Sequence, residues 1–265
     1  MEITDSDTPE EATRRLEGPL EKLRKLELAE SYVEILDTIE NWKESARGCL
    51  PKNPKEALKP YTQLKELAIQ MQELQEPAEG AAVHLVTYVQ KTSTDLWVEM
   101  KGIMSDDFES VLKESNWPDP QIEPTPEWSD SFERLLDLQA PEIMAARETL
   151  ILLPMSVLAK AFIQQFRYHF FSDKPTNHPH QLGDYFFEWF LGTITKWEGF
   201  LRENVGPILA AHFRSNLLAG NTLYVDPVAA FITALLPVLK EKVDSLVVEI
   251  SREPQYLSRF IVQLM

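Results

Sequence analysis

Apolar residues recur every three or four positions near the start of the chain, with charged residues between them. This spacing predicts an amphipathic helix. Thr8 and Glu11 have capping-box spacing and Pro9 suits the first helical position, so the helix is expected to run from residue 9 to about residue 46. Its apolar positions are Leu16, Leu20, Leu23, Leu26, Ala29, Val33, Leu36 and Ile39.

Two further helices are predicted, at residues 53–75 and 83–114, and the three should form one antiparallel bundle. The first helix is nearly twice as long as the second, so the bundle should leave part of its apolar stripe uncovered. Uncovered apolar surface marks a docking site, and a stripe of this spacing suits a partner helix. We therefore predict a partner-binding seam formed by Leu16, Leu20, Leu23, Leu26, Val33, Leu36 and Ile39.

Residues 117–126 are dense in proline and predict a linker between an N-terminal long-helix bundle (1–116) and a second bundle (127–265). Beyond it we expect helices at 125–139, from Pro141, at 154–170 and at 184–204. Another helix should begin at Asp226-Pro227 and bend at Pro237, and a last one should begin at residue 254. The predicted fold class is all-α, with antiparallel helical bundles arranged end to end.

A corner is predicted between the helices at 154–170 and 184–204. Phe166 and Phe170 are four residues apart and share one helix face, and Pro175 ends the helical path. We expect Arg167 and Asn177 to bond helix-end carbonyls, so that the corner is mainly structural. Direct contact with a partner is the alternative.

Composition narrows the choice of ligand. The net charge is −16 and the sequence pI is about 4.8, which argues against nucleic acid and anionic lipid as direct ligands. The single cysteine, Cys49, rules out an internal disulfide and fits a reducing compartment. The longest apolar run, residues 228–239, is too short to cross a bilayer, so we expect no direct bilayer insertion.

Catalytic and metal chemistry have weak candidates at the corner. His169, His178 and His180 lack a nearby cysteine to complete a zinc shell. Ser172 beside His169 and Asp173 has triad residue types, but the Gly-x-Ser-x-Gly pattern of a nucleophile elbow is absent from the sequence. We expect neither a cofactor nor an enzyme, and a histidine-based enzyme remains a rival hypothesis.

Three segments carry a resemblance to a known family. They are the corner residues Phe166, Arg167, Tyr168, His169, Phe170, Thr176 and Asn177, the stretch from Asp107-Phe108-Glu109 to Trp117-Pro118, and residues 23–27 followed by Tyr32. Together they resemble the RINT/TIP family of vesicle-tethering subunits of the Dsl complex, called NRZ in animals. The resemblance covers roughly residues 16–215, and family members are several times longer, so this chain resembles an N-terminal portion.

The resemblance implies a non-catalytic subunit for Golgi-to-ER retrograde transport. It implies that the N-terminal helices pair with a sister tether subunit and that the body links to SNAREs of the endoplasmic reticulum. Localisation would be cytoplasmic and peripheral on that membrane, through partners. A generic helical adaptor that binds another coiled-coil protein, including a cell-cycle checkpoint partner, is the alternative.

Overall fold

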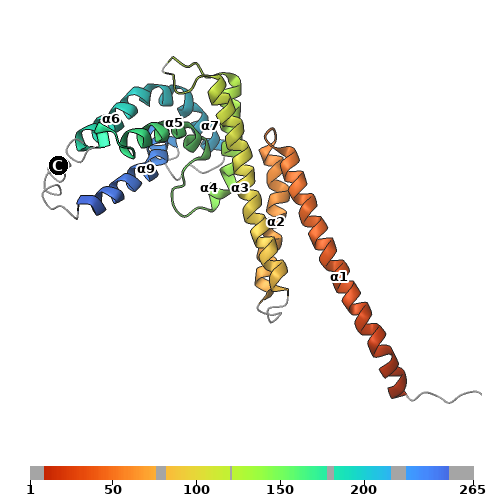
Figure 1. The fold of residues 1–265 in the computed structure, drawn as a ribbon. Helices are drawn as coiled ribbons and strands as arrows, with labels where there is room; N and C mark the ends of the chain where they lie inside the picture. Colours follow the sequence, from red (N-terminus) through yellow and green to blue (C-terminus); the bar gives the residue numbers. More distant parts are fainter. Residues whose placement is uncertain (1–8, 76–81, 120, 178–181, 216–224, 251–265) are drawn as a thin grey trace, which may run out of the picture. The chain divides into compact units, whose positions relative to one another are not determined.

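The computed structural model describes residues 9–75, 82–119, 121–177, 182–215 and 225–250, and all regular structure within these ranges is helical (Figure 1). The predicted all-α class is therefore confirmed. The end-to-end arrangement of the bundles stays a prediction. By its internal contacts the chain divides into two units, residues 1–49 with 56–97 (unit 1) and residues 50–55 with 98–265 (unit 2). This division falls inside a helix rather than in residues 117–126.

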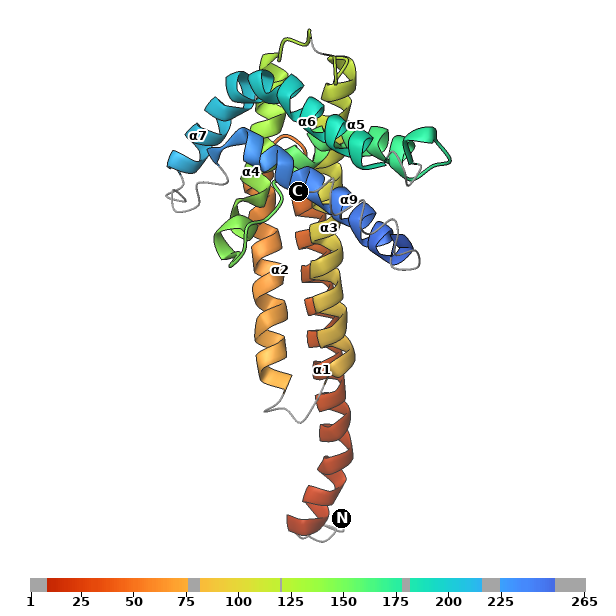
Figure 2. The ribbon, with the colours of Figure 1, turned by 90° about the vertical axis from the view of Figure 1, so that its left-hand side faces the viewer.

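Unit 1 contains α1 (Pro9–Cys49), most of α2 (Pro54–Gln75) and the first part of α3 (Val83–Glu114). α2 runs antiparallel to both α1 and α3 (Figures 1 and 2). Tyr61 of α2 stacks on Trp97 of α3 with ring centroids 4.8 Å apart. The buried side chains of this unit are almost all aliphatic and include Ile39, Ala46, Ala57, Leu64, Ala68, Leu85, Val86, Val89 and Leu96.

Unit 2 contains the remaining helices. They are the end of α3, α4 (Pro126–Ala145), α5 (Leu153–Phe170), η1 (Pro175–Asn177), α6 (Leu182–Phe200), the π-helical turn η2 (Leu201–Val205), α7 (Gly206–Ser215) and α9 (Pro227–Ile250). Among these elements α5 packs mainly against α9, and α4 contacts both α5 and α7. Their core is rich in aromatic residues, of which Phe108, Trp128, Phe132, Phe166, Phe170, Phe213 and Phe231 are almost completely buried.

Two predicted helix starts in unit 2 are confirmed by their caps. The Thr125 side chain accepts a hydrogen bond from the Trp128 N–H, 3.2 Å, and begins α4. The Asp226 carboxylate accepts one from the Val228 N–H, 2.9 Å, and begins α9. The predicted helix from residue 254 lies outside the described residues.

Two other boundaries differ from the prediction. No new helix begins at Pro141, because α4 continues through it to Ala145. A proline removes one intrahelical hydrogen bond, while the apolar side of α4 continues to Ile143, which is buried. The helix predicted to end near residue 204 instead continues through η2 into α7.

Polar contacts from α3 fix α4 and α5 in unit 2. Asp107 accepts hydrogen bonds from Ser131 Oγ (2.8 Å) and Arg134 Nη2 (3.1 Å) on α4. Glu109 pairs with Lys160 on α5, and this hydrogen bond is the main reason that the pKa of Glu109 lies below its ordinary value. Because these side chains bridge different helices, the acidic residues at the end of α3 do more than solvate its surface.

The segment predicted as a linker is fastened to unit 2 at its start. Trp117 Nε1 donates to the Leu158 carbonyl of α5, 3.1 Å, and its ring lies 4.7 Å from that of Trp197 on α6. The Trp117 ring also contacts Phe162 at 5.8 Å. Trp117 is therefore part of the aromatic core of this unit.

Candidate partner-binding surface

The first half of α1 exposes its apolar stripe. Leu20 and Leu23 are each 51% exposed, Leu26 is 67% exposed and Val33 is 55% exposed. Side chains of this kind are normally covered in a folded protein, and a contiguous row of them is typical of an interaction surface. We call these four residues, with Leu36, the α1 stripe.

The predicted seam is longer than the exposed surface. Ile39 is completely buried and therefore belongs to the core of unit 1, which corrects its assignment to the seam. Leu36 is half-buried and marks the transition. Leu16 falls within α1, but its side chain lies outside the described part of the chain.

The length of the neighbouring helices explains this division. α1 has 41 residues and α2 has 22, so α1 is about five turns longer than α2. Figures 1 and 2 show the N-terminal part of α1 continuing past the nearby ends of α2 and α3. The second half of α1 has cover within its own unit, where Tyr88 of α3 donates to Glu40 at 3.4 Å, and the first half has none among the described residues.

The corner after α5 is held by side-chain caps. Thr176 Oγ1 donates to the His169 carbonyl, 2.8 Å, and Asn177 Nδ2 donates to the Ser172 carbonyl, 3.0 Å. The Ser172 hydroxyl donates to the Tyr168 carbonyl. The bonds to Tyr168 and His169 satisfy carbonyls that are left free in the last turn of α5. Asn177 thus bonds a carbonyl two residues beyond the end of α5 and not one of the helix end as predicted, whereas Thr176 does bond a helix-end carbonyl.

Arg167 does not bond a helix-end carbonyl, so that prediction is wrong. Its guanidinium forms two bonds to the Glu241 carboxylate of α9, Nη1 to Oε1 at 3.1 Å and Nη2 to Oε2 at 2.5 Å. The carboxylate of Glu241 is within reach of the Arg167 guanidinium because α9 packs along α5. Arg167 thus joins two helices far apart in sequence.

Lys242, the residue after Glu241, makes a second link between α9 and the corner. It is only 5% exposed, and its ammonium donates to Asn177 Oδ1, 2.7 Å. The Phe171 ring lies close to both cations, 5.0 Å from the Arg167 guanidinium and 5.4 Å from the Lys242 ammonium. Sequence reasoning missed both α9 residues, and the only signal was the charged run 240–242 within an apolar helix.

The aromatic residues of the corner motif divide between core and surface. Phe166 and Phe170 are buried, and their rings pack on Phe186 and Trp189 of α6. Tyr168 is 56% exposed, with the Lys174 ammonium 4.5 Å from its ring centre. The motif therefore supplies the contact between α5 and α6 and closes the turn between them.

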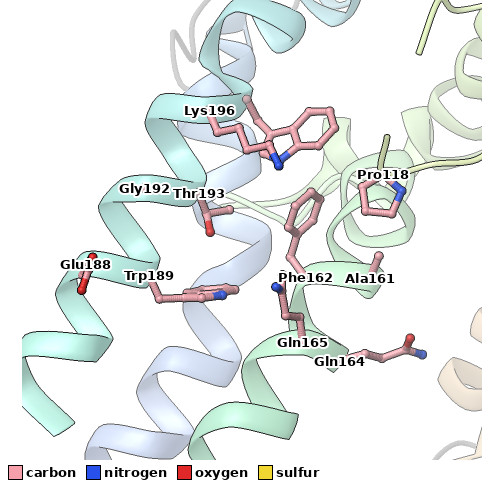
Figure 3. Close-up of a pocket in the computed structure, with 11 residues that line it drawn as sticks. Pro118, Ala161, Phe162, Gln164, Gln165, Glu188, Trp189, Gly192, Thr193 and Lys196 are labelled. Carbon is pink, nitrogen blue, oxygen red and sulfur yellow. The ribbon is translucent and has the colours of Figure 1, made fainter. Parts of the chain in front are cut away.

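Sequence reasoning also missed a cleft between α5 and α6, of about 540 Å³. Figure 3 shows Phe162 and Trp189 approaching it from opposite helices, with Pro118 at one end and Lys196 above. A smaller pocket of about 300 Å³ lies at the corner and shares Glu188 and Trp189 with it. Both are lined by a mixture of aromatic and polar side chains.

Neither a metal site nor a membrane-spanning helix is found within the described ranges. No group of three His, Cys, Asp or Glu side chains is arranged there to hold a metal ion, and His178 and His180 lie outside those ranges. No helix that the structure describes combines the length and the apolar character needed to span a bilayer.

A comparison with protein-family models matches residues 153–265 to the RINT-1/TIP-1 family. The matched region begins at α5 and contains the whole corner motif, so the resemblance carried by those residues is confirmed there. It supports a tethering-type role in general terms. No solved structure matches the chain.

Proposed function

We propose that this chain, which carries the RINT-1/TIP-1 family region in residues 153–265, is a non-catalytic subunit of a Dsl-type (NRZ) tethering complex. It acts in Golgi-to-ER retrograde transport. Its N-terminal helix pairs with a sister tether subunit, and its body links to SNAREs of the endoplasmic reticulum. The chain is cytoplasmic and reaches the membrane surface through these partners.

The observation that carries this proposal is the exposed α1 stripe. Leu20, Leu23 and Leu26 are each at least half exposed, on a helix that extends past the nearby ends of α2 and α3 (Figure 2). Burying such side chains against a partner contributes about 25 cal/mol for each Å² of apolar area removed from water. A helix in which apolar residues recur at this spacing binds best to another amphipathic helix, which supplies the missing side of the bundle.

The charge of the chain supports protein partners over membrane lipid. A net charge of −16 disfavours approach to an anionic membrane surface, where clustered basic residues would be needed. Attachment through SNAREs avoids this repulsion because it depends on protein contacts. The closely packed aromatic core of unit 2 suits a rigid supporting body.

The test compares two exposed leucines on opposite sides of α1. Leu26 is 67% exposed and lies on the stripe, whereas Leu28 is 71% exposed and lies about 160° away around the helix. Leu26→Asp should reduce co-purification of the sister tether subunit at least about tenfold, because it buries an unpaired charge in an apolar seam. Leu28→Asp should leave co-purification within about twofold of the unchanged chain.

Quantitative mass spectrometry of proteins recovered with the tagged full chain provides the measurement. Circular dichroism of both purified variants checks that helix content is unchanged. Equal recovery of the sister subunit with Leu26→Asp and with the unchanged chain would contradict the proposal. Recovery of a different coiled-coil protein, sensitive to the same substitution, would favour a generic adaptor instead.

A further inference from the structure

The apolar positions of α1 are arranged almost symmetrically about Leu26. Before it, Leu16, Leu20 and Leu23 lie 10, 6 and 3 residues away, and after it Ala29, Val33 and Leu36 lie 3, 7 and 10 residues away. If a second copy of this helix lies beside the first in antiparallel orientation, the apolar positions of one copy lie opposite the apolar positions of the other. That is the requirement for an isologous interface, in which the same surface of two identical chains meets itself.

The charges of α1 are opposite on the two sides of this centre. Residues 14–25 contain five basic and two acidic residues, a net charge of +3, and residues 27–38 contain four acidic residues and no basic one, a net charge of −4. The basic residues are Arg14, Arg15, Lys22, Arg24 and Lys25, and the acidic residues after the centre are Glu27, Glu30, Glu34 and Asp37. The two windows have equal length and lie at equal distances from Leu26.

We propose that, in the absence of its sister subunit, the chain pairs with a second copy of itself through α1, antiparallel and centred on Leu26. This goes beyond the proposed function, since it concerns the chain before a partner helix covers the stripe. Antiparallel pairing sets each basic window against an acidic one, and it brings Leu23 of one copy to the level of Ala29 of the other. Parallel pairing would set like charges together along the whole contact.

Association through α1 requires exposed apolar side chains and charged side chains that can reach the other copy, and the described side chains of the stripe and Lys25 meet these requirements. Leu20, Leu23, Leu26 and Val33 are each more than half exposed, so no rearrangement of unit 1 is needed to present them. Lys25 forms an ion pair with Glu21 of its own helix at 2.6 Å, with both side chains well exposed. A pair of this kind is worth little in water, so it does not prevent Lys25 from meeting an acidic window.

The first test measures the mass of the full chain by sedimentation equilibrium between about 1 and 100 μM, the range in which modest helix pairing is detected. The unchanged chain should show a monomer–dimer equilibrium. Leu26→Lys should weaken dimerisation at least about tenfold because it places two lysines at the centre of the contact. Leu28→Lys, on the other side of the helix, should leave the dissociation constant within about twofold.

The charge pattern gives a test of orientation. The double substitution Lys22→Glu and Lys25→Glu changes the first window from +3 to −1. In an antiparallel pair this window then faces a charge of −4, so dimerisation should weaken about tenfold, and less at high salt. In a parallel pair the same change would relieve repulsion and strengthen dimerisation, so the two orientations predict opposite signs.

A distance measurement checks the orientation independently. With Cys49 replaced by serine, Thr38→Cys provides a single site for a spin label on the exposed surface of α1. In the antiparallel pair each Thr38 lies level with Arg14 of the other copy, which places the two labels ~36 Å apart along the helix axis. In a parallel pair they would lie within roughly 15 Å.

A chain that stays monomeric at 100 μM would overturn this proposal. A distance within roughly 15 Å between the two spin labels, or tighter dimerisation after the double substitution, would overturn it as well. None of these outcomes bears on recovery of the sister subunit, which is measured separately with Leu26→Asp. Conversely, an antiparallel dimer accompanied by no sister subunit would support this proposal and contradict the proposed function.

Discussion

The helices α1 and α5 both place large apolar residues at helical spacing, and they differ in what covers them. On α5, Phe162 and Phe166 are at most 4% exposed. On α1, Leu23 and Leu26 are 51% and 67% exposed. α5 has α9 packed along it and contacts α4 as well, whereas α1 extends past the ends of its neighbours.

This difference teaches that periodicity defines an apolar side of a helix but not what covers that side. Cover depends on the length and path of other helices. In unit 2 the aromatic rings of α5 are met by those of α6 and α9, as with Phe162 and Phe231 at 5.4 Å. Unit 1 has shorter aliphatic side chains and no comparable cover for the first half of α1 among its described helices.

The largest expected effect is on the covered helix. Phe166 is completely buried, and its ring lies 4.7 Å from Phe170, 5.6 Å from Phe186 and 5.0 Å from Trp189. Phe166→Ala should lower the free energy of unfolding by about 3–5 kcal/mol, because it leaves a cavity among these rings. Urea unfolding followed by tryptophan fluorescence measures the change, and Trp189 is one of the reporters.

The matched control is Leu26→Ala on the exposed helix, measured near 1 μM so that association does not contribute. Its effect on the free energy of unfolding should stay below about 0.5 kcal/mol, because little of this side chain is removed from water. A loss as large as that of Phe166→Ala would mean that the α1 stripe is covered within the chain, and the contrast between the two helices would disappear.

Particular residues show how much of this contrast was predictable. The start of α4 at Thr125 and the apolar sides that carry Leu26 and Phe166 follow from cap chemistry and spacing, which are local. The exposure of Leu20 to Leu26 was predicted from a second signal, the greater length of the first helix than of the second. The pairing of Arg167 with Glu241 was not predictable, because 74 residues separate them and only the packing of α9 on α5 brings them together.

The same limit applies to Ile39 and Pro141. Ile39 continues the spacing of the α1 stripe without a break, and the burial that ends the exposed stripe is set by how far α2 and α3 extend along α1. Pro141 looks like a helix start, but the continuing apolar side of α4 outweighs one lost hydrogen bond. In both cases a tertiary contact overrides a correct local signal.

A second prediction concerns acid sensitivity, which should reside in unit 2. Burial lowers the pKa of His212 on α7 below its ordinary value of 6.5, against the opposing effect of Asp137, whose Oδ1 lies 3.7 Å from Nδ1. The unfolded chain therefore takes up this proton at higher pH than the folded chain. The contribution to stability is complete above about pH 6.5 and is lost as the pH falls below it.

The measurement is the urea midpoint at several pH values between about 5 and 8, on either side of the ordinary histidine pKa. His212→Gln should flatten the loss of stability on acidification relative to the unchanged chain. His84→Gln, at an exposed position of α3 in unit 1, should leave the slope as it was. Equal slopes for all three chains would mean that His212 does not carry the acid response.

The smallest expected effect is at the rim of the covered helix, where Arg167 of α5 meets Glu241 of α9. The two side chains are 47% and 48% exposed, so water screens the ion pair despite its bidentate geometry. A double-mutant cycle with Arg167→Ala and Glu241→Ala should give a coupling free energy of about 0.2–1 kcal/mol in urea unfolding. A coupling above about 2 kcal/mol would mean that this pair locks α9 onto the corner. The difference between α1 and α5 would then depend on a polar clamp as well as on apolar cover.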